Sequence, residues 1–205
     1  MARFVLKDSF YKKAKQEGFR ARSAYKLQEI QDRFHLIRKD DRVLDLGCAP
    51  GSWLQLLSQM VGGQGQVIGI DILPTLSLTA GNITTIEADI RKTDISEVLP
   101  GYAIDGFNVV TCDIAPNLSG VREVDDARIE ELFEAVLQIV EAALKPGGSF
   151  IIKSFFTNVQ KGITNALQER FVKVSTYKPA ASRSVSSEVY FICQGKRGTE
   201  LHSCI

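Results

Sequence analysis

Short apolar runs that resemble β-strands alternate with helical stretches along most of this sequence. We predict five strands from their enrichment in β-branched residues, at 42–46, 66–71, 83–87, 107–113 and 148–153. Apolar residues at helical spacing fill the gaps, most clearly at 53–61 and 126–144, and the KPGG segment at 145–148 ends the second helix. Because parallel strands need crossover connections, this order predicts a doubly wound, mostly parallel α/β sheet with helices on both faces.

The C-terminal part departs from this alternation. Segments 171–177 and 187–194 resemble a hairpin, so we predict one antiparallel strand near the C-terminus, as an edge partner of the sheet. The length of 205 residues fits a single domain. We divide it into a basic extension of two short helices (1–40), a Rossmann-like core (41–195) and a tail (196–205).

The composition is that of a soluble globular protein, with 44% apolar and 24% charged residues. The longest apolar runs, around Val109 and Ile151, are too short to span a bilayer, and no secretory apolar region follows Met1. We therefore expect a cytoplasmic protein that does not associate with membranes. No obligate protein partner is indicated, so a monomer is the default expectation.

Cysteines and histidines are few and scattered: Cys48, Cys112, Cys193, Cys204, His35 and His202. None belongs to a C-x-x-C pair, so we expect neither a metal site nor a disulfide framework. We also expect that proton transfer, if the protein performs it, does not depend on histidine.

A net charge of +1 conceals an uneven distribution. Residues 1–42 carry twelve Lys and Arg against six Asp and Glu, and residues 170–197 carry six against one, Glu188. Phe and Tyr residues are interleaved with the cations of the first segment. Two basic segments fit a track for a polyanion such as a nucleic acid. They fit equally well solvated helix faces whose aromatic residues turn toward the core.

The first predicted strand leads into a glycine-containing loop, GCAPGSW. Gly47 and Gly51 allow the backbone to pass close to a ligand, and Ser52 is a suitable helix cap. The loop lacks the G-x-G-x-x-G pattern, and Pro50 removes an N–H that a pyrophosphate would need. We therefore expect a ligand without phosphates near the loop. Trp53 fits either a cofactor contact or core packing.

Acidic residues follow the next two predicted strands. Asp71 can accept both hydroxyls of a ribose, although a helix cap or a solvated strand end is an alternative. Asp89, followed by Ile90, can accept a hydrogen bond from the amine of adenine. With the glycine loop, these positions predict a nucleoside pocket, and the missing phosphate motif favours S-adenosyl-L-methionine over NAD. We assign to cofactor binding Gly47, Pro50, Gly51, Ser52, Trp53, Asp71, Asp89, Ile90 and Asp113.

Four charged residues form a second candidate site: Lys26, Asp113, Lys153 and Glu188. The last three bracket the apolar runs FNVVTCD, SFIIK and EVYFIC. Because a buried charge without a partner is costly, we expect these residues to converge. Two ammonium groups beside two carboxylates can handle a proton.

Five segments extend this pattern: RSAYKL at 22–27, DLGCAPGSW at 45–53, CDIAPNLSG at 112–120, GGSFIIK at 147–153 and SRSVSSEVY at 182–190. In this order they resemble the motifs of the FtsJ-type (RrmJ-like) ribosomal RNA ribose 2'-O-methyltransferases, over nearly the whole chain. Two departures are minor: Ser52 stands where glycine is common, and Cys48 where alanine is common. Neither removes a proposed catalytic group.

The resemblance implies a Rossmann-like class I methyltransferase fold, S-adenosyl-L-methionine as cofactor, and the four charged residues as catalytic tetrad. Lys153 is then either the general base for the ribose hydroxyl or an ammonium that stabilises its developing alkoxide. Lys26 orients the ribose or holds a phosphate, and Glu188 orients a lysine. Asp113 serves both the tetrad and the amino group of the cofactor.

The implied partner is RNA, with a uridine of large-subunit ribosomal RNA as target. The 2'-hydroxyl distinguishes RNA from DNA, and the basic segments would supply phosphate contacts. Transfer RNA is the alternative substrate. From the residues alone, an NAD-linked oxidoreductase and a non-catalytic RNA-binding protein also remain open.

Overall fold

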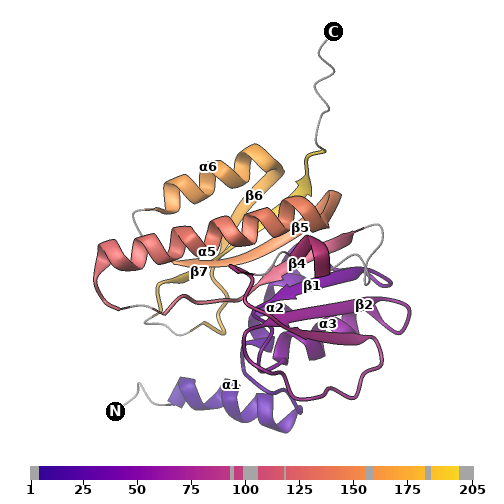
Figure 1. The fold of residues 1–205 in the computed structure, drawn as a ribbon. Helices are drawn as coiled ribbons and strands as arrows, with labels where there is room; N and C mark the ends of the chain where they lie inside the picture. Colours follow the sequence, from indigo (N-terminus) through magenta and orange to yellow (C-terminus); the bar gives the residue numbers. More distant parts are fainter. Residues whose placement is uncertain are drawn as a thin grey trace.

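A seven-stranded sheet forms the centre of the protein, in a computed structural model that describes residues 5–92, 95–98, 106–117, 119–155, 159–182 and 186–198 (Figure 1). The strands are β1 (Arg42–Leu46), β2 (Gln66–Asp71), β3 (Ile83–Glu87), β4 (Phe107–Cys112), β5 (Leu144–Phe155), β6 (Phe171–Tyr177) and β7 (Glu188–Lys196). The helices are α1 (Val5–Gln16), α2 (Ala24–Phe34), α3 (Ser52–Val61), α4 (Ile95–Val98), α5 (Arg122–Ala143) and α6 (Gln160–Arg170). The order β3-β2-β1-β4-β5-β7-β6 reverses between β1 and β4, where open α/β sheets bind their ligands.

Most predicted strands are confirmed, and β1, β2 and β3 match to the residue. β4 ends at Cys112, so Asp113 is the first residue beyond the strand rather than its last. β5 is longer than predicted, because Leu144 already pairs with Phe107 directly after α5. A register shift between Phe107 and Val109 accommodates the turn-like residues that follow.

Helix α5 starts at Arg122, four residues before the predicted start. The Asp125 carboxylate accepts the backbone N–H groups of Ser119 and Gly120 at 2.6 and 2.9 Å. These bonds tie the preceding loop to the first helical turn and favour an early start.

The antiparallel strand was predicted correctly, but its place in the sheet was not. β7 lies between β5 and β6 and is antiparallel to both, so the edge strand is β6. Most of β7 is buried, whereas β6 has exposed positions such as Lys173. The nearly continuous apolar run VYFIC is typical of a strand that is buried on both faces, which explains why β7 and not β6 lies inside the sheet.

Helices cover both faces of the sheet (Figure 1). Helices α5 and α6 pack on one face, where Leu44, Ile68 and Phe150 meet Val136 and other α5 residues. Helices α2 and α3 pack on the other, where Val43, Val67 and Ile151 meet Leu27 and Leu57. Alternate residues of each strand thus enter two separate cores, as the strand period of two requires. Each fully buried aliphatic or aromatic side chain contributes about 1.5–3 kcal/mol to this packing.

The N-terminal extension packs through its aromatic residues. The rings of Phe10 and Phe19 lie 5.6 and 5.9 Å from that of Tyr25, beside the buried Ala14 and Ala181. The lysines of α1 between Phe10 and Phe19, such as Lys15, are exposed. Aromatic groups therefore fix the extension to the core and leave these lysines of α1 facing solvent. Within the described residues, no helix combines the length and apolarity that crossing a bilayer demands.

Candidate active site

The carboxyl ends of β1, β2 and β4 open into a cavity of about 690 Å³. Five of the residues assigned to the cofactor line it: Gly47, Asp71, Asp89, Ile90 and Asp113. Helix α5 adds Arg128, Glu131 and Leu132, which the sequence had not indicated. The size lies within the range of roughly 300–1,000 Å³ that small-molecule sites occupy.

Gly47 shapes the floor of this cavity. Its φ of 77° suits glycine, and a Cβ there would lie only 2.2 Å from Cγ1 of Ile114. Ile114 itself lines the cavity. A side chain at position 47 would therefore displace a wall of the site.

The remaining assigned residues, Pro50, Gly51, Ser52 and Trp53, are not among those that line the cavity. The Ser52 hydroxyl lies 2.8 Å from that of Ser23, and the Trp53 indole N–H donates to the Ser23 carbonyl at 2.9 Å. Ser52 and Trp53 are buried, and the Trp53 ring stacks on Tyr190 with centroids 6.1 Å apart. Ser52 and Trp53 thus lie in the core beneath the loop.

Asp71 holds two parts of the cavity wall together. Its Oδ2 accepts the backbone N–H of Ala49 at 2.8 Å, and its Oδ1 accepts that of Leu73 at 2.9 Å. Each carboxylate oxygen has a further lone pair available. Asp71 can therefore fix the loop and still accept hydrogen bonds from a ligand.

Asp89 is paired with Arg91, a cavity residue that the sequence interpretation missed. The guanidinium donates to both carboxylate oxygens, at 3.1 and 3.0 Å. Hydrogen bonds from the Arg91 side chain and backbone lower the pKa of Asp89. Asp89 is thus an ionised acceptor at neutral pH.

Asp45, the first residue of the DLG motif, is buried beneath the loop with 1% of its surface exposed. Its Oδ1 accepts the Thr111 hydroxyl at 2.7 Å, whereas Oδ2 has no hydrogen-bond partner within the described chain. Burial raises the pKa of Asp45 to about 8; the bond from Thr111 opposes this shift, and the charges of Asp113 and Asp71 reinforce it. The site therefore contains a carboxyl group that is largely protonated at neutral pH.

Lys153 and Asp113 form one ion pair of the candidate tetrad. The Lys153 Nζ lies 3.1 Å from Asp113 Oδ1 and donates to the Asp113 backbone carbonyl at 2.5 Å. Cys112 of β4 pairs with Ile152 of β5, so the next residue of each parallel strand emerges on the same face. Sheet register therefore brings together two residues that lie 40 positions apart.

Lys26 and Glu188 form the other pair, with Nζ 2.5 Å from Oε1 and side chains only 10% and 12% exposed. Burial raises the pKa of Glu188, but hydrogen bonds from Lys26 and Ser182 and the charges of Lys26 and Lys153 outweigh it, so the pKa is lowered overall. Glu188 is therefore ionised at neutral pH. Arg183, in the same sequence motif, lies outside the described residues.

Tyr190 connects the two pairs. It lies opposite Lys153 on β7, two residues after Glu188, so these three side chains share one sheet face. Its hydroxyl donates to Asp113 Oδ1 at 2.6 Å, and Lys26 Nζ is 5.8 Å from its ring centroid. Burial, reinforced by Asp113, raises the pKa of Tyr190 well above its ordinary value. Tyr190 therefore remains a hydrogen-bond donor, a role the sequence interpretation missed.

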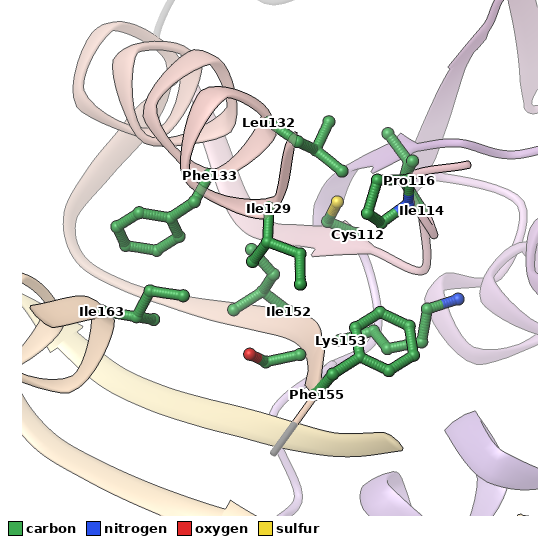
Figure 2. A pocket seen from close by; sticks show the side chains of 11 residues that line it. Cys112, Ile114, Pro116, Ile129, Leu132, Phe133, Ile152, Lys153, Phe155 and Ile163 are labelled. Carbon is green, nitrogen blue, oxygen red and sulfur yellow. The ribbon is translucent and has the colours of Figure 1, made fainter. Parts of the chain in front are cut away.

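A smaller apolar pocket lies beside the Lys153 stem (Figure 2). Figure 2 shows Lys153 extending past Phe155, with its nitrogen directed away from Phe133 and Ile163. The apolar wall keeps the alkyl stem dry and leaves the ammonium on the polar side of the site.

Two cations of the second basic segment, Lys196 and Arg170, are bound within the protein. Lys196 is 9% exposed and donates to three carbonyls at the end of α5, those of Val140, Glu141 and Leu144. Arg170 pairs with Glu141 at 2.9 Å. Both cations complement the C-terminus of α5 and are committed to that structural role.

This sheet, with its single reversed strand and a site at the strand ends, is the Rossmann-like fold of a methyltransferase. A Plasmodium falciparum structure, provisionally assigned as a ribosomal RNA methyltransferase, shares the fold with a TM-score of 0.78 at 24% identity, covering 88% of this chain and all of that one. The chain belongs to the FtsJ-like methyltransferase family, whose model matches residues 19–196.

Two curated relatives carry the name ribosomal RNA large subunit methyltransferase E. The protein of Methanothrix thermoacetophila is 44% identical over 186 residues, covering 91% of this chain and 71% of the relative. That of Methylobacillus flagellatus is 43% identical over 187 residues, covering 90% and 89%.

S-adenosyl-L-methionine is the methyl donor of this methyltransferase family. The cavity fits such a molecule, because carboxylates on β2 and after β3 offer acceptors for hydroxyl and amino groups, between apolar walls that include Ile72 and Leu132. No group of three His, Cys, Asp or Glu side chains suited to a metal ion occurs within the described ranges.

Proposed function

We propose that this protein methylates the 2'-hydroxyl of a ribose in ribosomal RNA, with a uridine of the large subunit as target. The observation that carries the proposal is the convergence of the Lys153–Asp113 and Lys26–Glu188 pairs beside the cavity. The names of the curated relatives support a large-subunit substrate.

The reaction requires a hydroxyl oxygen aligned with the methyl–sulfur bond of the cofactor. The bound cofactor supplies an electrophilic methyl carbon. The hydroxyl must give up its proton, to water or to a base, before or while the oxygen attacks, because an oxygen that kept the proton would become positively charged. The resulting alkoxide needs a nearby cation, and its negative charge would be consumed as the oxygen–carbon bond forms and the carbon–sulfur bond breaks. Lys153 meets this requirement as an ammonium, since Asp113 holds it through two oxygens and one N–H remains for the substrate. To act as general base instead, it must first release a proton.

The other three tetrad residues position this ammonium and the ribose. Asp113 holds Lys153 directly, and Tyr190 fixes the Asp113 carboxylate from the opposite strand. Glu188 holds Lys26, whose remaining N–H groups can bind the ribose or an adjacent phosphate. Each lysine thus lies against a carboxylate in a part of the site with little exposure to water.

The cofactor residues divide into contacts and supports. Asp71 accepts the hydroxyls of the cofactor ribose and Asp89 the amine of its adenine, while Gly47 and Ile90 shape the walls. Ser52 and Trp53 support the loop from the core, and Pro50 and Gly51 belong to the loop without lining the cavity. Asp113, which also lines the cavity, is close enough to serve both the cofactor and the tetrad.

The N-terminal extension supplies the RNA contacts. Exposed lysines of α1, including Lys15, precede α2, which carries Lys26 into the site. Phosphates held by this extension would place a ribose near Lys153, with affinity that falls as salt rises. The protein acts on its substrate as a monomer in the cytoplasm, and sedimentation of the purified chain tests the first of these two statements.

The proposal is tested by methyl transfer from labelled S-adenosyl-L-methionine to large ribosomal subunits that lack ribose methylation, to naked ribosomal RNA and to transfer RNA. We expect labelling of the subunit at one uridine, located by nuclease mapping of the resistant 2'-O-methyl linkage. If only transfer RNA is labelled, the substrate is transfer RNA and not ribosomal RNA. If the label is found on a base, the protein is not a ribose methyltransferase.

Two substitutions at Lys153 separate its possible roles. Lys153→Arg keeps a cation that proteins do not deprotonate, and Lys153→Met removes it. If the ammonium stabilises the alkoxide, Arg retains more activity than Met. Equal inactivity of both variants, with wild-type cofactor binding, would favour the general base.

A further inference from the structure

Arg20, one of the cations of the first basic segment, has its guanidinium bound to backbone carbonyls of the protein. Nη1 donates to the carbonyls of Pro50 and Leu76 at 2.8 and 2.7 Å, and Nη2 donates to that of Ser77 at 2.8 Å. Pro50 belongs to the cofactor loop, and the other two carbonyls belong to the segment after β2. A single side chain thus joins two segments that are far apart in sequence.

The backbone of Arg20 is fixed as well. Gln55 of α3 accepts the Arg20 N–H through Oε1 at 2.9 Å and donates to the Gly18 carbonyl through Nε2 at 2.8 Å. The turn between α1 and α2 is therefore attached to the helix that follows the cofactor loop. Because both ends of the side chain are held, the guanidinium has a defined position.

The segments that Arg20 joins are walls of the cofactor cavity. Gly47 and Ala49 of the loop line it, as do Ile72 and Leu73 after β2, whereas Arg20 itself does not. Asp71 ties the same two segments together from inside, through the N–H groups of Ala49 and Leu73. Arg20 makes the matching connection from outside, close against Gly51, where an added Cβ would lie 3.0 Å from Nη1.

We infer that Arg20 is a positioning residue for the cofactor cavity and not an RNA phosphate contact. Its three carbonyl bonds set the spacing between the cofactor loop and the segment 72–78, and so the shape offered to the cofactor. The inference rests on the proposed function only in taking this cavity as the S-adenosyl-L-methionine site. It requires that loss of Arg20 weakens cofactor binding when no RNA is present.

The test measures S-adenosyl-L-methionine affinity calorimetrically, without RNA, for wild type, Arg20→Lys and Arg20→Gln. Lysine keeps the charge but lacks the planar fork, so we expect both variants to bind the cofactor about tenfold more weakly. The salt dependence of RNA binding is measured in parallel. For both variants the slope of log affinity against log salt should equal that of wild type.

Lys15→Gln is the matched control, because Lys15 is an exposed cation of the same extension. It should leave cofactor affinity unchanged and reduce the salt slope by about one contact, which is the behaviour of a phosphate ligand. If Arg20→Gln behaves like Lys15→Gln, Arg20 is a phosphate contact and the inference is wrong. Unchanged cofactor affinity in both Arg20 variants would also show that the inference is wrong.

Gln55→Leu loosens the same connection without altering charge, and decides the matter should the Arg20 variants fail to fold. We expect about a threefold loss of cofactor affinity, since two hydrogen bonds between neutral groups disappear. Wild-type affinity in a folded Gln55→Leu variant would count against the inference. If wild type itself does not bind S-adenosyl-L-methionine, the cofactor assignment fails first, which distinguishes that outcome from failure of the role of Arg20.

Discussion

Lys153 and Lys196 lie on the neighbouring strands β5 and β7, toward opposite ends of the sheet, and they are equally buried, with side chains 9% and 8% exposed. Each also lies near a carboxylate, Asp113 at 3.1 Å and Glu141 at 3.5 Å. They differ in how their N–H groups are used. Lys196 donates to three backbone carbonyls, whereas the partners of Lys153 in the described chain are two oxygens of one residue, Asp113.

The comparison teaches that burial and ion pairing alone do not decide whether a lysine is free to act on a substrate. An ammonium has three donors, and when backbone carbonyls accept all three it has none left for a substrate. Lys196 therefore satisfies the carbonyls at the end of α5, whereas Lys153 retains an N–H donor for a ligand beside the cavity. The following predictions test this distinction, beginning with the largest expected effect.

Lys153→Met should reduce methyl transfer at least about a thousandfold, because the group that stabilises the developing negative charge is lost. The rate is measured in single turnovers with saturating cofactor. Cofactor affinity and the urea midpoint should remain close to those of wild type. Loss of activity that merely follows loss of folded protein would make Lys153 a structural residue like Lys196.

Lys196→Met should have the converse effect. It leaves three carbonyls of α5 without a donor, at a cost of about 1–3 kcal/mol for each buried group that water does not reach, so we expect the free energy of unfolding to fall by about 3 kcal/mol. Urea unfolding measures the loss, and methyl transfer per folded molecule should be unchanged. A stable but inactive Lys196→Met protein would show that Lys196 acts in methyl transfer and is not a purely structural lysine.

Asp45 allows a pH-dependent test at the end of the sheet that carries the candidate site. Burial raises its pKa to about 8, so the folded protein retains a proton that the unfolded chain has already lost above about pH 4. The Asp45 carboxyl group therefore makes the free energy of unfolding fall as pH rises from about 4 to 8, by at most about 1.4 kcal/mol per pH unit. Asp45→Asn cannot titrate, and its stability relative to wild type should rise across this range. Parallel stability curves from pH 5 to 8 would refute the assignment.

Tyr190→Phe should have the smallest effect. It removes the O–H that donates to Asp113 and keeps the ring that stacks on Trp53, so we expect about a tenfold lower kcat at nearly unchanged stability. Tyr177→Phe is the matched control, since Tyr177 pairs with Tyr190 across β6 and β7 and its hydroxyl lies 3.5 Å from Glu29. If both variants are equally active, Tyr190 does not position Asp113.

Much of the fold was predictable from the sequence because buried parallel strands leave a distinct local signal. β1, β2 and β3 are short β-branched runs with clear ends, and their bounds were correct. The start of β5 was not, because a KPGG segment favours a turn and only the pairing of Leu144 with Phe107 extends the strand. The apolar run VYFIC of β7 is typical of an interior strand, but the strands that it pairs with are distant in sequence, and no local pattern identifies them.

The candidate site divides in the same way. Residues at strand ends, such as Asp71 and Asp113, were identifiable because parallel strands deliver their carboxyl ends to one edge. Arg91 and the α5 residue Arg128 were missed, since a charged residue on an exposed helix face or loop gives no sign of the cavity it faces. The structural role of Lys196 was not predicted either, because composition records charge and not the backbone carbonyls that a charged side chain will contact.

The interior position of β7 has a consequence for how the protein matures. Glu188 and Tyr190 come from a strand that follows β5 and β6 along the chain yet inserts between them. Until it does, β5 and β6 present unpaired edges and Lys26 lacks its carboxylate partner. Assembly of the sheet and assembly of the proposed tetrad are thus one event, because a chain in which β7 is not yet in place lacks the Glu188 and Tyr190 side chains at the candidate site.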